Sequence, residues 1–178
     1  MRRRLFFWEL GGFLFTGALG AALHFVYDWS GRNPAAAAFS AVNESTWEHM
    51  KLLCVPVFLL SVVQVCVLGR DCPHLLWSRA LSTLAGLALI PVLFYTYTGV
   101  LGFFVDWANI AVFYLADAGL FALDSWLLRR GRRGALWRQV AGLAVLWGLM
   151  FSFVFCTFRP PHIALWQDPV TGQYGIPR

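Results

Sequence analysis

Residues 80–101 read ALSTLAGLALIPVLFYTYTGVL, a run of apolar and small residues that contains no charged side chain. A bilayer core about 30 Å thick is crossed by about 20 apolar residues in helical form. Further segments of similar length and character lie on both sides of this run. The expected membrane spans are residues 5–27, 50–69, 80–101, 103–128 and 138–158. The sequence therefore predicts an all-α fold, a polytopic membrane bundle of about five transmembrane helices.

The composition supports a membrane protein. Of the 178 residues, 59% are hydrophobic and 13% are charged, whereas about 25% of the residues in a soluble domain are charged. The nine Trp and sixteen Phe residues add more apolar bulk than one compact core of this length could hide from water. These features exclude a disordered chain, a coiled coil and an ordinary soluble domain. The Cys residues form no Cys-x-x-Cys pair, which excludes the common zinc fingers.

The basic residues predict the orientation. With the N-terminus in the cytoplasm, ten of the fourteen Lys and Arg residues fall on the cytoplasmic side, namely Arg2, Arg3, Arg4, Arg70, Arg79, Arg129, Arg130, Arg132, Arg133 and Arg138. The other side receives Arg32, Lys51, Arg159 and Arg178. By the positive-inside rule, we expect a multi-pass protein of the bacterial inner (plasma) membrane whose loop 28–49 and tail 159–178 lie outside. Because the basic residues lie in separate loops, we expect the lipid bilayer as a partner and no nucleic acid.

The first span leaves an alternative open, a signal peptide that is cleaved near Leu23. Arg residues precede this span and small residues lie near its end, as in such peptides. The apolar stretch is long for a signal peptide and contains Glu9, which favours a retained helix.

His24 and Asp28 lie at the end of the first span, four residues apart and therefore on the same helix face. The carboxylate of such a pair can orient the imidazole for metal binding or proton transfer. Such pairs are common on any helix, so an interfacial His beside an acidic neighbour is the other interpretation, and the sequence leaves both open.

The most distinctive polar stretch is NESTWEHMK at residues 43–51. Ser45 and Glu48 are spaced as in a capping box, in which each side chain binds a free N–H group at the start of a helix. Trp47 is expected to anchor the helix at the membrane interface. Capping does not explain Glu44 and His49, and ionisable clusters at membrane depth are often functional. This stretch is therefore a candidate site.

The motif Asn-Glu-Ser-x-Trp-Glu-His-x-Lys, which follows a helix that ends in His-x-x-x-Asp, resembles a family of small bacterial integral membrane proteins of unknown function. The tail, with Pro160-Pro161 and the segment DPVTGQYG at 168–175, is similar to the ending of that family. The resemblance covers most of the chain. It implies a multi-pass membrane fold and carries no activity.

The span 103–128 contains Asp106, Asp117 and Asp124, separated by eleven and seven residues. These spacings are close to whole numbers of helical turns, so the carboxylates share one stripe along the helix. The stripe must face other helices or water, because a charged carboxylate in lipid costs about 2.5 kcal/mol or more. Glu9 lies on a Gly-containing face of the first span, so we expect these spans to pack with Glu9 near Asp124 and with His24 or Asp28 near Asp106. Asp117 is expected to be neutral, and either to handle protons or to form a structural hydrogen bond, as a protonated group, with a helix backbone, Tyr95 or Thr98.

The first of three hypotheses is a membrane-embedded hydrolase or transferase that acts on lipid-derived or extracytoplasmic substrates. Its candidate catalytic residues are Glu44, Glu48, His49, Asp106 and Asp117. Its candidate metal ligands are His24, Asp28, His49 and His162. Imidazole and carboxylate donors suit a divalent metal such as zinc.

The second hypothesis is a proton- or ion-coupled transporter that uses Asp106, Asp117 and Asp124 as a relay. Five helices form a thin wall for a pore, so this hypothesis predicts a homo-oligomer. The third hypothesis is a non-catalytic membrane partner or assembly protein that contacts another membrane protein through loop 28–49 and the tail. The sequence identifies neither a substrate nor a bound metal.

Overall fold

The computed structural model describes residues 2–131 and 135–177. Within these residues the chain is helical, with one isolated bridge between Gln167 and Tyr174. The elements are α1 (Arg2–Trp29), α2 (Pro34–Ala37), α3 (Thr46–Leu68), α4 (Leu75–Leu101), α5 (Asp106–Arg130), α6 (Leu136–Phe158) and the 3-10 turn η1 (Ala164–Trp166). Of these, 5 helices are long and apolar enough to cross a membrane, which confirms the predicted fold class. Arg132, Arg133 and Arg178, which the sequence-based orientation counted, lie outside the described residues.

The helices begin earlier than hydropathy predicted in two places that matter for the polar residues. Helix α3 starts at Thr46 because the Ser45 hydroxyl accepts a hydrogen bond from the backbone N–H of Glu48. Glu48 and His49 therefore lie in the first turn of a helix and not in a loop. Helix α4 starts at Leu75, so that Arg79 lies inside the helix.

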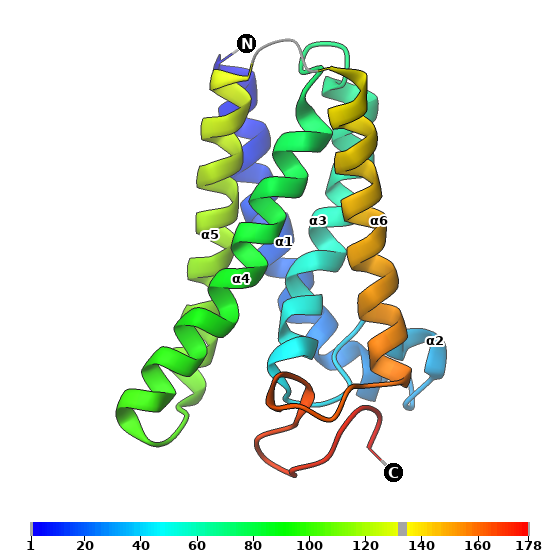
Figure 1. The fold of residues 1–178 in the computed structure, drawn as a ribbon, viewed down its shortest axis with the longest axis vertical. Coiled ribbons are helices and arrows are strands. Elements are labelled where there is room, and N and C mark those ends of the chain that lie inside the picture. The colour runs from blue at the N-terminus through cyan, green and yellow to red at the C-terminus, as the bar shows by residue number, and fades with distance from the viewer. Residues whose placement is uncertain (1, 132–134, 178) are drawn as a thin grey trace.

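The long helices run roughly along one axis, and α4 crosses the bundle diagonally (Figure 1). We call the end that carries loop 30–45 and residues 159–177 the tail end, and the opposite end, near the N-terminus, the far end. At the far end α4 packs closely on α6, and the absence of a side chain at Gly142 allows this approach. A Cβ atom there would lie 2.5 Å from the Leu76 carbonyl oxygen. Toward the tail end α4 pairs with α5, and this hairpin diverges from α3 and α6 (Figure 1).

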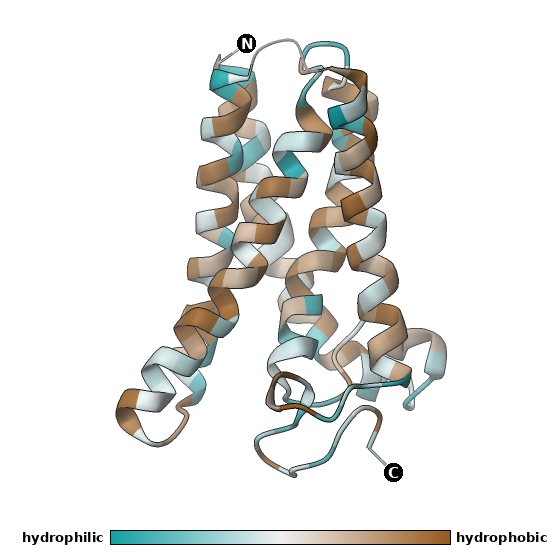
Figure 2. Cartoon of the chain, in the orientation of Figure 1, coloured by the Kyte–Doolittle hydropathy of each residue, from teal (hydrophilic) through white to brown (hydrophobic). Residues whose placement is uncertain are grey.

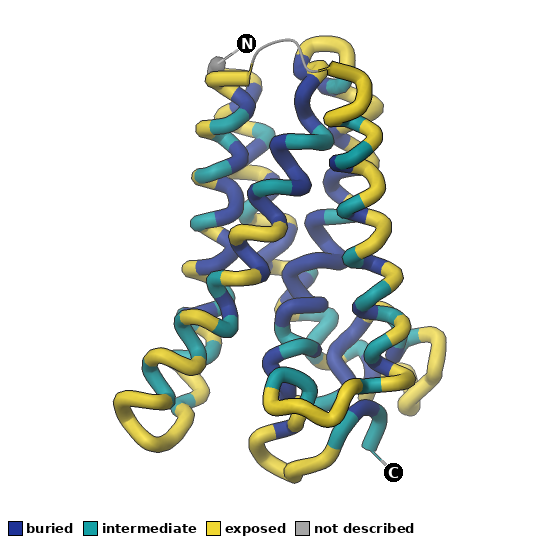
Figure 3. The backbone as a smooth tube through the Cα atoms, in the orientation of Figure 1, coloured by how far each residue is buried: buried dark blue, intermediate teal, exposed yellow. Residues whose placement is uncertain are grey.

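The surface of the bundle is largely apolar and its interior contains polar groups. Figure 2 shows hydrophobic residues along the outside of the long helices, and Figure 3 shows that these outward positions are the exposed ones. Leu14, Trp147 and Phe151 are examples of exposed large side chains in the spans, whereas Lys51 and Arg79 are fully buried. This inverted distribution is what a protein surrounded by lipid requires.

Helices α1 and α5 pack through glycine, as the sequence predicted. A Cβ atom on Gly17 would lie 2.8 Å from the Tyr114 ring, and one on Gly20 would lie 2.6 Å from the Phe113 ring. Small residues allow helix backbones and rings to approach this closely. The contact holds α1 in the bundle and brings its polar face against α5.

The C-terminal tail folds back over the tail end. The Asn43 side chain donates a hydrogen bond of 2.8 Å to the Gly175 carbonyl oxygen. The Trp47 ring packs between Phe153 and Trp166, with centroid distances of 4.4 and 4.5 Å. Trp47 therefore anchors the tail through these ring contacts. The tail covers one side of the segment 43–51 and fixes it against α6.

Candidate functional site

Three ionisable side chains meet at the tail end. His24 lies near the end of α1, Glu44 lies in the loop before α3, and His49 lies in the first turn of α3. The Nε2 atom of His24 is 3.6 Å from one carboxylate oxygen of Glu44, and the Nε2 atom of His49 is 3.5 Å from the other. One ligand atom from each side chain falls within 4.8 Å of the other two. We call these residues the His-Glu-His cluster.

The backbone of the α3 cap orients the His49 ring. Its Nδ1 atom lies 3.0 Å from the carbonyl oxygen of Ser45, one turn earlier in the helix. A carbonyl oxygen can only accept, so Nδ1 carries the proton and donates it. In the neutral ring the Nε2 lone pair is then free and points toward Glu44. Histidines that bind metal through one ring nitrogen typically donate a hydrogen bond from the other ring nitrogen.

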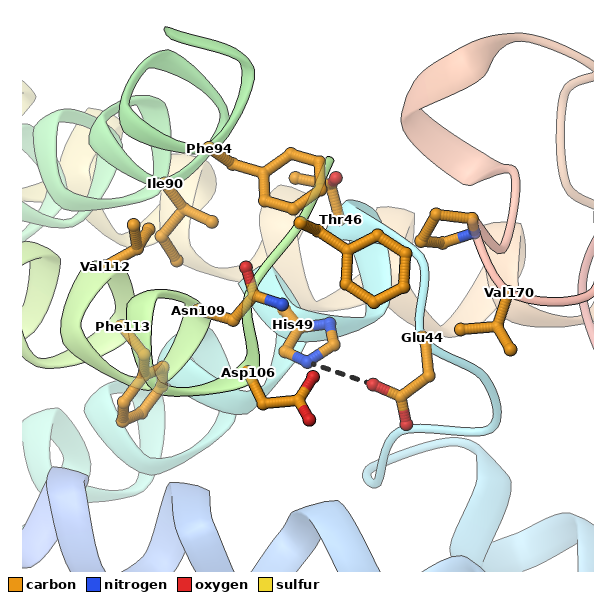
Figure 4. A pocket seen from close by; sticks show the side chains of 12 residues that line it. Glu44, Thr46, His49, Ile90, Phe94, Asp106, Asn109, Val112, Phe113 and Val170 are labelled. Atoms are coloured by element: carbon orange, nitrogen blue, oxygen red, sulfur yellow. Dashed lines mark ion pairs between the residues drawn. The ribbon is translucent and has the colours of Figure 1, made fainter. Parts of the chain in front are cut away.

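The His-Glu-His cluster opens into a cleft of about 560 Å³ between α1, α3 and α5. Glu44 and His49 also line an adjoining cavity of about 130 Å³, which reaches the tail at Pro169 and Val170. Figure 4 shows the carboxyl group of Asp106 and the His49 ring facing the same space. The cleft exists because the α4–α5 hairpin diverges from α3, which leaves the start of α5 apart from the segment 43–51.

Asp106 and Asn109, on the first turn of α5, line both cavities. The Tyr97 hydroxyl accepts a hydrogen bond from the backbone N–H of Val105 and donates one to the Oδ1 atom of Asn109. This contact assigns the amide orientation and leaves the Asn109 NH₂ group available to a ligand in the cleft. The hydrogen bond between Asn109 and Tyr97 was not predicted from the sequence. The position of Asn109, one turn after Asp106 on the same helix face, could have indicated that it lines the site.

Glu48 belongs to a different, buried cluster. Its carboxylate lies 2.5 Å from the Lys51 Nζ atom and accepts a hydrogen bond of 2.9 Å from the Thr157 hydroxyl. Lys51 also donates to the Ala37 carbonyl oxygen at 2.8 Å. The reciprocal half of the expected capping box, a bond from the Ser45 N–H to Glu48, is wrong, since that N–H donates to Asn43. Glu48 thus ties α2, α3 and α6 together and does not line the cleft.

Two other predicted ligands lie apart from the His-Glu-His cluster. The Asp28 side chain is 74% exposed and lies 3.5 Å from Arg32. The His162 ring stacks on Tyr174 at a centroid distance of 4.6 Å. Neither residue lines the cleft.

Asp117 is fully buried in the middle of α5. Neither carboxyl oxygen has a hydrogen-bond partner among the described residues. The expected bond from Thr98 is absent there, because the Thr98 hydroxyl donates to the Phe94 carbonyl oxygen. Asp117 lies beside Gly17, below the cleft, and does not line it.

A second ionic cluster lies toward the far end. The buried Arg79 guanidinium is 2.9 Å from Asp124 and 3.3 Å from Glu9, and it donates a bond of 2.6 Å to Gln64. The predicted approach of Glu9 to Asp124 is therefore confirmed. The placement of Arg79 in a cytoplasmic loop is wrong, because its partners draw it into the bundle. Hydropathy did not predict this pairing, because the span was expected to begin one residue after Arg79.

Residues 5–176 match a protein family described as "Family of unknown function (DUF6512)". The match agrees with the resemblance to an uncharacterised family. No curated protein and no solved structure matches the chain. Because the family match covers nearly the whole chain, the protein belongs to DUF6512, a family of unknown function.

Proposed function

We propose that this integral membrane protein binds a divalent metal ion such as zinc at His24, Glu44 and His49 and uses it in a hydrolytic or transfer reaction. The observation that carries the proposal is the convergence of these side chains at the mouth of the cleft. Catalytic zinc sites typically have three protein ligands and an open position, and sets of two imidazoles and one carboxylate are among them.

The distances suit such a site. Zinc bonds of about 2.0–2.2 Å in tetrahedral geometry place neighbouring ligand atoms about 3.4 Å apart. The Nε2 atoms of His24 and His49 lie 3.6 and 3.5 Å from different carboxylate oxygens of Glu44, and one ligand atom from each side chain lies within 4.8 Å of the other two. Changes in side-chain torsions would bring one carboxylate oxygen and both Nε2 atoms to zinc-binding distances beside the cleft that these residues line.

Asp106 is the candidate general base, because its carboxylate lines the cleft and has no partner among the hydrogen bonds and ion pairs of the described residues. Zinc held by His24, Glu44 and His49 would supply an activated water molecule and would polarise a carbonyl or phosphoryl group. Asp106 would accept the proton that the attacking water loses and pass it to the leaving group as the bond to that group breaks. The Asn109 NH₂ group could donate to the oxygen on which charge develops.

The distribution of basic residues supports an extracytoplasmic site in the bacterial inner membrane. Arg3, Arg4, Arg129 and Arg130 are exposed at the far end, opposite the His-Glu-His cluster. By the positive-inside rule the far end would be cytoplasmic and the tail end would face outside.

The test is the zinc content of the protein, purified in lipid nanodiscs and equilibrated with a slight excess of Zn²⁺. We expect about one equivalent to remain after gel filtration. His24→Ala and His49→Ala should each lose it, whereas His162→Ala, which removes a histidine at the same end, should retain it. Wild-type protein that retains no more zinc than the His24→Ala/His49→Ala double variant would overturn the proposal.

Glu44→Gln separates two roles for this carboxylate. If Glu44 is a ligand, as the distances favour, the variant should lose most of its zinc. If Glu44 is instead the general base, the variant should keep zinc and lose turnover only. Asp106→Asn should show this second behaviour, because Asp106 is placed as the base.

A proton- or ion-coupled transporter is the second candidate, favoured by Asp117, a buried carboxyl group with no hydrogen-bond partner among the described residues. Five helices give a thin wall, so such a pore would need a homo-oligomer or a membrane partner. Proton flux into liposomes that is abolished by Asp117→Asn and unaffected by His49→Ala would favour transport over metal-dependent chemistry.

A further inference from the structure

The cleft beside the His-Glu-His cluster changes in polarity along its length. His24, Glu44 and Asp106 line it at the tail end, and the deeper lining residues are Gly20, Ala21, Leu52, Ile110, Phe113 and Tyr114. Along α5, Asp106 and Asn109 precede the apolar lining residues. Along α1, His24 follows Gly20 and Ala21, and Phe25 comes directly after it. Since the two helices run in opposite directions, both place their polar groups at the same end. The cleft is thus polar at its mouth and apolar below.

One side of the cleft is open toward the expected hydrocarbon. Its back wall is formed by Leu52, which is buried, and by Phe113. Its lips are Phe25, Ile110 and Tyr114, which are 51%, 59% and 39% exposed. These residues belong to segments long and apolar enough to cross a membrane. A ligand could therefore enter sideways from the bilayer.

The packing of α1 on α5 closes the floor of the cleft. Tyr114 contacts Gly17 so closely that a Cβ atom there would lie 2.8 Å from its ring. Gly17 and His24 are seven residues apart, which corresponds to about 10 Å along the helix. The apolar part of the cleft is therefore short. The whole cleft, with its polar mouth, has a volume of about 560 Å³, which suits one small ligand.

We infer that the substrate of the proposed metal site is a membrane amphiphile, whose polar reacting group meets His24, Glu44 and His49 while the start of one acyl chain lies between α1 and α5. This inference rests on the proposed function and adds the class of substrate. A small water-soluble substrate would use only the polar mouth. It would leave unexplained an apolar cleft that opens sideways beneath the ligand atoms.

The experiment uses Co²⁺ in place of Zn²⁺ and two hydroxamic acids, which chelate metals through two oxygen atoms. Acetohydroxamate has almost no chain, whereas decanohydroxamate has a chain that would enter the cleft. Binding is followed by the visible absorption of bound Co²⁺ in nanodiscs of fixed composition. The measured quantity is the ratio of the two dissociation constants. Partition of the longer probe into lipid contributes equally to this ratio in every variant.

Ile110→Trp fills the cleft, and Leu115→Trp is its matched control. Ile110 and Leu115 are both apolar residues of α5 and are 59% and 58% exposed, but Leu115 does not line the cleft. We expect Ile110→Trp to reduce the preference for decanohydroxamate by about tenfold, which corresponds to about 1.4 kcal/mol. Leu115→Trp should leave the preference as in the wild type. Equal preferences in both variants would overturn the inference and leave the metal site standing.

Failure of the metal site gives a different pattern, since no Co²⁺ would bind to any variant. Occupancy of the cleft by an acyl chain is then measured by photolabelling with a decanoyl amphiphile that carries a diazirine. Residues 20–25 and 110–114 should be labelled more strongly than Leu14, which is exposed but outside the cleft. Ile110→Trp should remove this excess. Labelling no stronger than at Leu14 would show that no acyl chain occupies the cleft.

Discussion

At the scale of single residues, the buried ammonium group of Lys51 has a structural role. Its ammonium group has three oxygen partners, from Glu48, Ala37 and Thr157, which satisfy its three N–H donors. A buried ion pair contributes little net stability compared with apolar residues, but removal of one partner leaves an uncompensated charge.

Lys51→Met should therefore lower the free energy of unfolding by about 3–5 kcal/mol. The double variant Lys51→Met/Glu48→Gln should recover part of this loss, because no unpaired charge then remains beside Thr157. The measurement is the denaturant or thermal midpoint of the protein in a mild detergent. A Lys51→Met midpoint equal to that of the wild type would contradict the assigned role of this pair.

The sequence identified His24, Glu44, His49 and Asp106 as candidates, because ionisable groups are costly at membrane depth and stand out in an apolar chain. All four line the same cleft. The sequence did not separate Glu48 from them. Its partner Thr157 is 109 residues away, and only the packing of α3 on α6 brings the two together.

At the scale of the helices, the contact of α1 with α5 depends on glycine. A Cβ atom on Gly20 would lie 2.6 Å from the Phe113 ring and 2.8 Å from the Leu52 carbonyl oxygen. The Leu52 oxygen belongs to the backbone of α3, which cannot move away by a change of side-chain rotamer.

Gly20→Ala should therefore destabilise the bundle by about 1–3 kcal/mol through overpacking. Gly11→Ala is the matched control on the same helix, because a Cβ atom there meets nothing within 4 Å. It should leave stability unchanged or raise it by up to about 1 kcal/mol, since Ala favours the helix over Gly. Midpoints that shift equally in both variants would show that the close approach at Gly20 is unimportant.

The five long helices could be predicted from length and hydropathy alone. Hydropathy alone did not give the starts of two of them, at Thr46 and Leu75. The start of α3 follows from Ser45, whose spacing from Glu48 is typical of a helix cap. The start of α4 depends on Arg79, which hydropathy excluded from the span but which a buried counter-charge holds inside the helix.

At the scale of the whole molecule, the orientation in the membrane decides which compartment reaches the cleft. The exposed Arg residues at the far end predict that the tail end faces outside. Two exposed positions test this orientation, Arg70 in the α3–α4 loop and Val170 in the tail.

In a background without native cysteines, Val170→Cys should react with a membrane-impermeant maleimide in intact cells. Arg70→Cys should react only after the membrane that holds the protein is permeabilised. The opposite pattern of labelling would place the His-Glu-His cluster in the cytoplasm.

The central claim is that His24, Glu44 and His49 form one metal centre, and X-ray absorption of the zinc-loaded protein in nanodiscs tests it most directly. The account predicts a first shell of about four nitrogen and oxygen atoms at about 2.0–2.1 Å, with the multiple-scattering signature of two imidazole rings. His162→Ala should leave this spectrum unchanged. A spectrum without imidazole scattering, or one with sulfur at about 2.3 Å, would contradict the account.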